Sequence, residues 1–415
     1  MRSRRFALFM LVFLFLSLSA MPRMEVHAES EGIQVIRPAY GMINILVDVN
    51  LLNNQLAQYS SLSLRSFDKQ ELYHQAVQQL NDGSFDHRAF LQRYKLEPNS
   101  SMPNEKKPKR LYTHQLIQGG SFLLNKEAQT SFSYIFVLYD ASGYPIYYKY
   151  AELPDIEVKM STNPTIVALM YHHFTEKKEE QTSVTVHKDM FRKQLQALKA
   201  DGFVSIRQQE LLAFLKGDKR VKLPEKSVII TIDDGYESNY KLAYPILVQE
   251  QFYASIFAVT SYRGKTPSIY PHFTWEQASE MYSSGYVDIQ NHTHESHYYG
   301  TTTGRTRPAL ISRLIVNNRL ESQFVYEKRI YNDMKKAKSL IEQHIGNKVI
   351  ALTYPYGSYN QTVINKAAAS GHSLMYTIKE GVIRKGSNPH ALPRINVDGK
   401  YSAKAMMDRI YTHLR

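Results

Sequence analysis

The pattern of apolar and polar positions changes near residue 165. Beyond that point, short apolar runs alternate with amphipathic stretches long enough to form helices. The predicted strands are 165–174, 227–232, 254–260, 286–290, 349–354 and 373–378. The predicted helices are 187–203, 240–251, 274–285, a long stretch that ends with 335–346, and 361–371. Such alternation predicts a parallel sheet, and about eight β-α units favour a (β/α) barrel over an open sheet.

The chain before residue 155 has a different pattern. Residues 130–150 contain two aromatic, β-branched runs around a turn at 140–143, which predicts a β-hairpin. Residues 66–95 have a helical pattern. This combination predicts a small α+β domain, and no chemical constellation is visible within it.

Two breaker-rich segments divide the chain. The first, residues 97–110, is polar, basic and contains proline, and the second covers residues 153–165. We therefore expect an accessory α+β domain over residues 32–155 and a catalytic-type α/β domain over residues 165–415.

The first residues resemble an export signal. Arg2, Arg4 and Arg5 precede an apolar run at 6–20, and small residues follow before Ala28. The run is short for a membrane span of about 20 residues, so we expect a signal peptide over residues 1–28 that is cleaved after Ala28, leaving no transmembrane span. The protein is then secreted or associated with the cell wall. An uncleaved anchor is the alternative.

Composition limits the partners more than the fold. The chain has 415 residues, 43% of them hydrophobic, and no cysteine, so neither a disulfide nor a cysteine-linked lipid is available. The formal net charge is +13. For an exported protein this charge favours an anionic cell-wall surface over nucleic acid, and plain solvated surface charge is an equally good explanation.

Polar side chains follow four of the predicted strands at the point where each strand ends. Because the carboxyl ends of parallel strands meet at one edge of a sheet, these side chains are expected to converge. They are Asp233 and Asp234; His292, His294 and His297; Tyr356 and Gly357; and His172 and His173.

A cation would explain why two carboxylates stand side by side. Adjacent carboxylates repel each other unless positive charge lies nearby. If one aspartate binds a divalent metal together with imidazoles, the other can stay ionised as a base. Each motif also has a simpler explanation: a polar, histidine-rich loop, or an aspartate pair in a turn with Gly235.

In this order, the motifs resemble those of the polysaccharide deacetylase (NodB-homology) domain, carbohydrate esterase family four, over residues 165–400. The three stretches are "TIDDGY", "HTHESH" and "YPYG". The resemblance implies a distorted (β/α) barrel and an acetylated glycan substrate. Three features are similar to those of the exported branch that includes poly-N-acetylglucosamine deacetylases. They are the five-residue spacing of His292 and His297, the "YHH" strand and the stretch "LPRINV".

The resemblance also implies roles for particular residues. Asp234, His292 and His297 would hold a divalent metal, with zinc expected and cobalt, nickel or manganese also tolerated. Asp233 would be the general base. The backbone N–H of Tyr356 would stabilise the oxyanion of the reaction.

The sequence departs from the family pattern in two places. Thr353 stands where the third motif usually has an arginine, and Arg394 of "LPRINV" is a candidate to supply the missing positive charge beside Asp233. The usual late leucine-x-histidine motif is not clear. His172 is the candidate general acid, with His173 and His390 as competitors, and His294 competes with His297 as a metal ligand.

The function predicted from these residues is a secreted, metal-dependent hydrolase. It would remove acetyl groups from N-acetylglucosamine units of a cell-envelope or matrix polysaccharide, acting on carbon–nitrogen amide bonds other than peptide bonds. A non-catalytic glycan-binding protein on the same fold is the alternative, and a metal-dependent phosphoesterase is a third hypothesis.

Residues 298–330 are long for a βα connection and could form a lid, a substrate rim or a surface insertion. The arginines that would give this segment a basic edge are Arg305, Arg307, Arg313 and Arg319.

Overall fold

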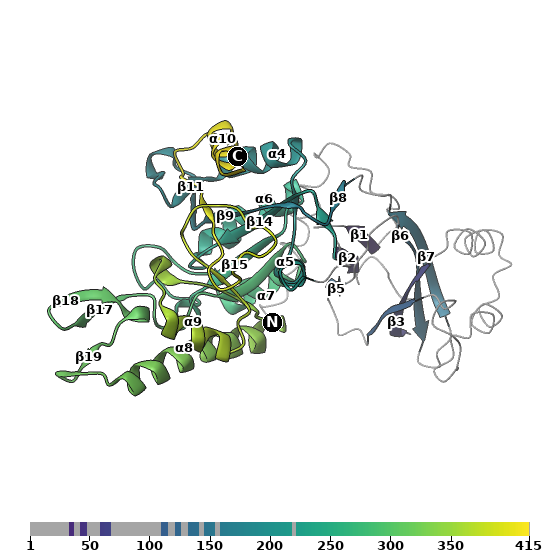
Figure 1. Cartoon of the computed structure of the whole chain (residues 1–415). Coiled ribbons are helices and arrows are strands. Elements are labelled where there is room, and N and C mark those ends of the chain that lie inside the picture. The colour runs from purple at the N-terminus through teal and green to yellow at the C-terminus, as the bar shows by residue number, and fades with distance from the viewer. Residues whose placement is uncertain are drawn as a thin grey trace. The chain divides into compact units, whose positions relative to one another are not determined.

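The structure of the chain is a computed structural model (Figure 1). It describes residues 158–217 and 221–414, together with the backbone of seven strands between residues 33 and 153. The chain divides into two compact units, and residues 156–415 belong to the second. The predicted signal peptide and almost all of the predicted helix at 66–95 lie outside the described residues.

The strands before residue 154 form two sheets. One has the order β4-β3-β6-β7 and the other the order β1-β2-β5. The bounds are β1 Ile33–Ile36, β2 Met42–Val47, β3 Tyr59–Phe67, β4 Lys109–His114, β5 Ser121–Asn125, β6 Phe132–Asp140 and β7 Pro145–Leu153. The predicted hairpin is confirmed, because β6 and β7 pair antiparallel with Val137 opposite Tyr148.

The second unit is built on a parallel sheet of eight strands, as the alternating pattern predicts. The order along the sheet is β22-β21-β16-β15-β14-β9-β23, and β12 pairs with β14. The bounds are β9 Thr165–Tyr171, β12 Val204–Ser205, β14 Lys226–Ile232, β15 Ala254–Ala258, β16 Val287–Asn291, β21 Ala351–Thr353, β22 Leu374–Tyr376 and β23 Ile395–Asn396. All of these pairs are parallel.

The two edges of this sheet are joined by the chain around Leu392. Tyr376 of β22 forms a parallel bridge with Leu392, and the N–H of Thr377 donates to the Leu392 carbonyl. Three residues after Leu392 the chain enters β23, which pairs with β9 at the other edge of the sheet. The sheet therefore closes irregularly, which confirms the predicted distorted (β/α) barrel.

Helices cover the sides and one end of the barrel. They are α4 Lys188–Ala200, α5 Gln208–Leu215, α6 Tyr244–Glu250, α7 Trp275–Ser283, α8 Gln323–Ile345, α9 Gln361–Ala369 and α10 Ala403–Leu414. The longest, α8, begins where the Ser322 hydroxyl accepts the Val325 N–H and ends at Gly346, whose positive φ of 78° suits a residue without a Cβ. Among the described helices, none is both long and apolar enough to cross a bilayer.

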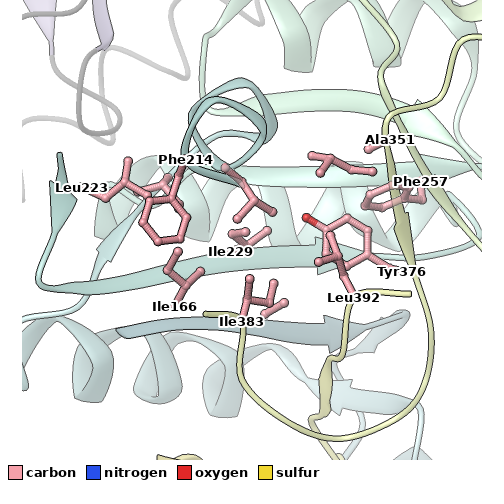
Figure 2. Packing of buried hydrophobic residues seen from close by; sticks show 13 residues of the cluster. Ile166, Phe214, Leu223, Ile229, Phe257, Ala351, Tyr376, Ile383 and Leu392 are labelled. Atoms are coloured by element: carbon pink, nitrogen blue, oxygen red, sulfur yellow. The ribbon is translucent and has the colours of Figure 1, made fainter. Parts of the chain in front are cut away.

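The barrel interior is filled by alternate residues of the strands. Ile166, Ile229, Phe257, Ala351 and Tyr376 come from five different strands and form one buried cluster (Figure 2). Because side chains alternate between the two faces of a strand, the next inward positions continue this cluster toward the carboxyl ends of the strands.

Helix α5 contributes to the same core at the opposite end of the strands. Leu211 and Phe214 pack with Ile166, Ile229 and Leu223 (Figure 2). The apolar plug leaves the carboxyl ends of the strands as the end of the barrel where polar groups gather.

The connection between β16 and α8 holds two small hairpins in place of an unstructured loop. Strands β17 (Tyr299–Thr302) and β18 (Arg305–Pro308) pair antiparallel, as do β19 (Ile315–Val316) and β20 (Arg319–Leu320). Both hairpins project from the barrel at the N-terminal end of α8 (Figure 1).

We expect Phe214→Ala to lower the free energy of unfolding of the barrel by about 3 to 5 kcal/mol, since it empties a buried site at the plugged end. The single tryptophan of the chain, Trp275, lies in α7, so its fluorescence during guanidinium unfolding reports on the barrel. Val184→Ala, at an exposed position, is the matched control and should change stability by no more than about 0.5 kcal/mol. Equal stability of the two variants would contradict the assignment of α5 to the core.

Candidate active site

The two adjacent aspartates leave β14 in different directions. Asp233 continues the inward row of Ile229 and Thr231, and its N–H donates to the Tyr171 carbonyl. Asp234 then adopts a left-handed conformation with φ of 71°, and Gly235 follows with φ of 76°. Such a conformation is costly for a residue with a Cβ. It turns the second carboxylate away from the first, so each can have its own positively charged partner.

Asp233 is paired with Arg394. The guanidinium donates from Nη1 to Oδ1 at 2.9 Å and from Nη2 to Oδ2 at 2.8 Å, in the bidentate geometry of a strong charge-assisted pair. Arg394 is fully buried and also donates to Thr231 and to the Thr377 carbonyl. Burial alone would raise the pKa of the Asp233 carboxyl, but Arg394 and, secondarily, His292 hold it below its ordinary value. Asp233 therefore stays ionised.

Asp234 meets two histidines. Its Oδ1 lies 3.3 Å from Nε2 of His292 and 3.2 Å from Nε2 of His297. One ligand atom from each of the three residues lies within 4.8 Å of the other two. Burial would raise the pKa of Asp234, but the two imidazoles hold it well below its ordinary value. The three groups thus form a compact cluster around a buried carboxylate that needs positive charge.

This cluster fits a divalent metal. Ligand atoms about 2.1 Å from a tetrahedral zinc lie about 3.4 Å apart, close to the 3.3 and 3.2 Å that separate Oδ1 of Asp234 from the two imidazole nitrogens. The Oδ1 atom of Asp234 is buried and has no aligned hydrogen-bond donor among the described residues, which leaves a lone pair for a cation. One carboxylate and two imidazoles form a donor set that suits zinc and other first-row metals.

A backbone carbonyl outside the candidate metal cluster orients His292. Its Nδ1–H donates to the carbonyl of Thr353 at 3.0 Å, which leaves Nε2, on the side of Asp234, as the atom that would bind a metal. Thr353 is the residue that stands where the family's third motif has an arginine. The positive charge beside Asp233 comes from Arg394, the residue directly before the last strand β23.

Tyr356 lies at the exposed edge of the cluster. It has φ of 57° and ψ of 17°, and its ring packs against His297 with 4.6 Å between centroids. No described group accepts a hydrogen bond from the Tyr356 N–H. The turn therefore has a free backbone donor at a residue whose ring contacts one of the candidate ligands.

The structure separates the histidines that compete for the role of general acid. His172 has Nε2 4.0 Å from Asp233 Oδ2, and its Nδ1 is buried without a described partner. His173 instead stacks on Tyr270 at 3.9 Å, with Nδ1 bonded to the Ser238 hydroxyl. His390 has no described contact with either aspartate, and its backbone N–H donates to the side-chain oxygen of Asn388.

His294 points away from the candidate metal cluster. Its Nδ1 lies 2.8 Å from the Thr260 hydroxyl, and Nε2 faces Glu295. Its backbone N–H donates to the carboxylate of Asp333 on α8, as does that of Glu295. The structure therefore brings His297, and not His294, to Asp234.

Arg263 is a residue that sequence reasoning missed. It is buried, and it donates to the carbonyls of Asp234 at 3.0 Å, Gly235 at 2.8 Å and Val259 at 3.2 Å. A Cβ on Gly235 would lie 2.5 Å from the guanidinium, so glycine is required for this close approach. No motif marks Arg263, because its partners are main-chain atoms that any residue supplies.

Comparison with known proteins agrees with this geometry. The polysaccharide deacetylase family model matches residues 220–375 of this chain. It is 26% identical over 261 residues to the poly-beta-1,6-N-acetyl-D-glucosamine N-deacetylase of Escherichia coli K12, covering 59% of this chain but only 38% of that relative. It is 27% identical over 248 residues to the putative polysaccharide deacetylase YxkH of Bacillus subtilis, covering 60% of this chain and 77% of the relative.

Solved structures share the fold. A de-N-acetylase from Aggregatibacter actinomycetemcomitans superposes with a TM-score of 0.53 at 25% identity, covering 59% of this chain and 99% of that one. IcaB from Ammonifex degensii gives a TM-score of 0.51 at 25% identity, covering 60% of this chain and 97% of that one. The resemblance seen in the three motifs is thus confirmed at the level of domain and fold.

We expect Arg263→Met to weaken the binding of a divalent metal such as zinc by about 10- to 100-fold, because outer residues of a metal site hold its ligands in place. The measurement is calorimetric titration of metal-depleted protein. Arg305→Met, an exposed arginine on β18, is the control and should bind as the wild type does. Wild-type affinity in Arg263→Met would show that the loop holds its shape without the guanidinium.

Proposed function

We propose that the protein is a secreted, metal-dependent hydrolase. It removes acetyl groups from N-acetylglucosamine units of a cell-envelope or matrix polysaccharide. The observation that carries this proposal is the cluster of Asp234, His292 and His297 beside a second, ionised carboxylate. The named activities of the relatives support an amide-cleaving deacetylase with this class of substrate.

The metal would be held by Asp234, His292 and His297, with zinc as the expected ion and cobalt, nickel or manganese as alternatives. A divalent ion in such a site lowers the pKa of water and polarises a carbonyl oxygen. The same charge would satisfy the buried carboxylate of Asp234.

Asp233 is the proposed general base. Its ion pair with Arg394 keeps it deprotonated and fixes the orientation of the carboxylate at the strand end. It accepts the proton of the attacking water, while the carbonyl carbon of the acetamide becomes tetrahedral. Arg394 then stabilises the pair as a positioning residue and does not touch the substrate.

The leaving nitrogen needs a proton, and His172 is the proposed general acid because it is the candidate histidine that lies at Asp233. Burial holds the pKa of His172 below its ordinary value, because it outweighs the raising effect of Asp234 and Asp233. The free N–H of Tyr356 is the proposed donor to the developing oxyanion.

Export and domain organisation belong to the same proposal. Residues 1–28 would direct the chain out of the cell and be cleaved, and residues 32–155 would form an accessory domain beside the deacetylase domain of residues 165–415. The net positive charge suits an anionic wall surface around the acetylated polymer.

The two alternative functions would require a different set of residues at this site. A glycan-binding protein without catalysis has no need to keep Asp233 buried and ionised next to the candidate metal cluster. A phosphoesterase with two metals needs more ligands, and within the described part of the chain one three-residue cluster is found.

Acetate release with and without metal tests the proposed function. Removing the metal with a chelator should abolish release from N-acetylglucosamine oligosaccharides, poly-N-acetylglucosamine or peptidoglycan, whichever is the substrate, and adding zinc or cobalt back should restore it. Activity that persists after the metal content falls below one-tenth of the protein concentration would refute metal dependence. No release from any of the three would favour the binding protein.

Single substitutions should separate the two carboxylates. Asp233→Asn is expected to lower kcat at least 100-fold, since general base catalysis alone contributes about 10² to 10⁴, while metal content stays at one ion per chain. Asp234→Asn should lose both activity and metal. Metal content is measured by elemental analysis after dialysis. The assignment is wrong if Asp233→Asn keeps full activity or if Asp234→Asn keeps its metal.

A further inference from the structure

Aromatic rings lead outward from the candidate metal cluster along the first hairpin. The ring of Tyr356 lies 4.6 Å from His297 and 4.7 Å from Tyr299 of β17, measured between centroids. Tyr356 is 38% exposed and Tyr299 is 54% exposed. Tyrosines that contact each other yet remain this open are not core residues, so another role is needed for them.

The hairpins are anchored by buried charge. The carboxylate of Glu321 accepts from Arg329 of α8 at 2.8 and 2.9 Å and from the Leu314 N–H at 2.9 Å. Arg329 also donates to the carbonyls of Ala309 and Ser312. Arg329 therefore ties the segment between the hairpins and the end of the second hairpin to the first turns of α8.

Close packing also holds β17 in place. A Cβ on Gly300 would lie 2.6 Å from Leu314, so the strand lies directly on the chain that leads to the second hairpin. Leu310, between the hairpins, belongs to the buried cluster of α8, α9 and β21. Tyr299 is thus carried by a fixed rim, and its position next to Tyr356 is built in.

We propose that Tyr299 and Tyr356 form a stacking subsite for a pyranose ring that neighbours the acetylated unit held at the metal cluster. This inference rests on the proposed function. A pyranose presents an apolar C–H face and a rim of hydroxyl groups, and an exposed tyrosine offers a flat apolar face with a polar edge. The row of rings starts at a candidate metal ligand, so a glycan chain reaching the site passes over it.

Such a subsite gives the enzyme a preference for polymers. Binding energy from sugars that do not react can be used to position the acetamide that does, so longer substrates gain in kcat/KM. The hairpin insertion then sets how much of that gain is available, while the metal cluster and Asp233 carry out the reaction.

The test compares single variants on a fully acetylated N-acetylglucosamine pentasaccharide, in the repeat linkage that the wild type prefers, in two assays. One assay measures acetate release, and the other measures pentasaccharide binding by calorimetry with the full chain loaded with zinc. Tyr299→Ala should lose about tenfold in kcat/KM and in affinity, the size expected when one aromatic contact is removed. Tyr299→Phe should stay within about twofold of wild type, because the ring is kept.

Tyr298→Ala is the matched control. Tyr298 is 44% exposed, precedes β17 by one residue and has no described ring contact with Tyr356. Metal content is measured for each variant, so that damage to His297 is seen separately. Equal losses in Tyr298→Ala and Tyr299→Ala, or no loss in Tyr299→Ala, would overturn the subsite.

The two assays keep this inference distinct from the proposed function. Wild-type protein that binds the pentasaccharide through Tyr299 but releases no acetate would refute the deacetylase and leave the subsite standing. Normal acetate release that is unaffected by Tyr299→Ala would refute the subsite alone. Wild-type protein that neither binds nor deacetylates the pentasaccharide refutes both.

Discussion

Two buried carboxylates on consecutive residues are the constraint around which the site is organised. Asp233 and Asp234 would repel each other strongly in a low-dielectric interior. The left-handed backbone at Asp234 separates them, and each then meets positive charge from a different side. Arg394 neutralises Asp233 from within the barrel, and two imidazoles surround Asp234, where a divalent ion would complete the balance. The strained turn is supported by Arg263, which holds its carbonyls.

The barrel makes this arrangement possible because it brings distant strands to one rim. Arg394 is 161 residues from Asp233, and the two meet because the last strand pairs beside β9. His292 is oriented by a carbonyl of the neighbouring strand β21. With α5 and apolar side chains filling the other end, the candidate functional groups gather at the carboxyl ends of the strands. The hairpins before α8 extend this rim with aromatic surface, and the buried Glu321–Arg329 pair keeps them fixed.

Much of this could be predicted from the sequence because the signals are local. Strand-like runs ending in Asp233–Asp234 or His292 predicted the parallel sheet and the edge where these side chains gather, and the order of three motifs predicted the similarity to polysaccharide deacetylases. The contact of Arg394 could only be guessed, since it depends on how the barrel closes through a strand of two residues, Ile395–Asn396. Helices α5 and α10 and the two hairpins were not predicted. Arg263 gave no signal at all, because its partners are backbone carbonyls.

The central claim is that one cation is shared by Asp234, His292 and His297 while Asp233 stays with Arg394. The most direct measurement is a crystal structure of the zinc-loaded protein with anomalous data collected above and below the zinc absorption edge. We expect a single peak in the barrel, about 2 Å from Oδ1 of Asp234 and from Nε2 of both histidines, with the Asp233–Arg394 pair intact. An anomalous peak bound to Asp233, or none between these three side chains, would contradict the account.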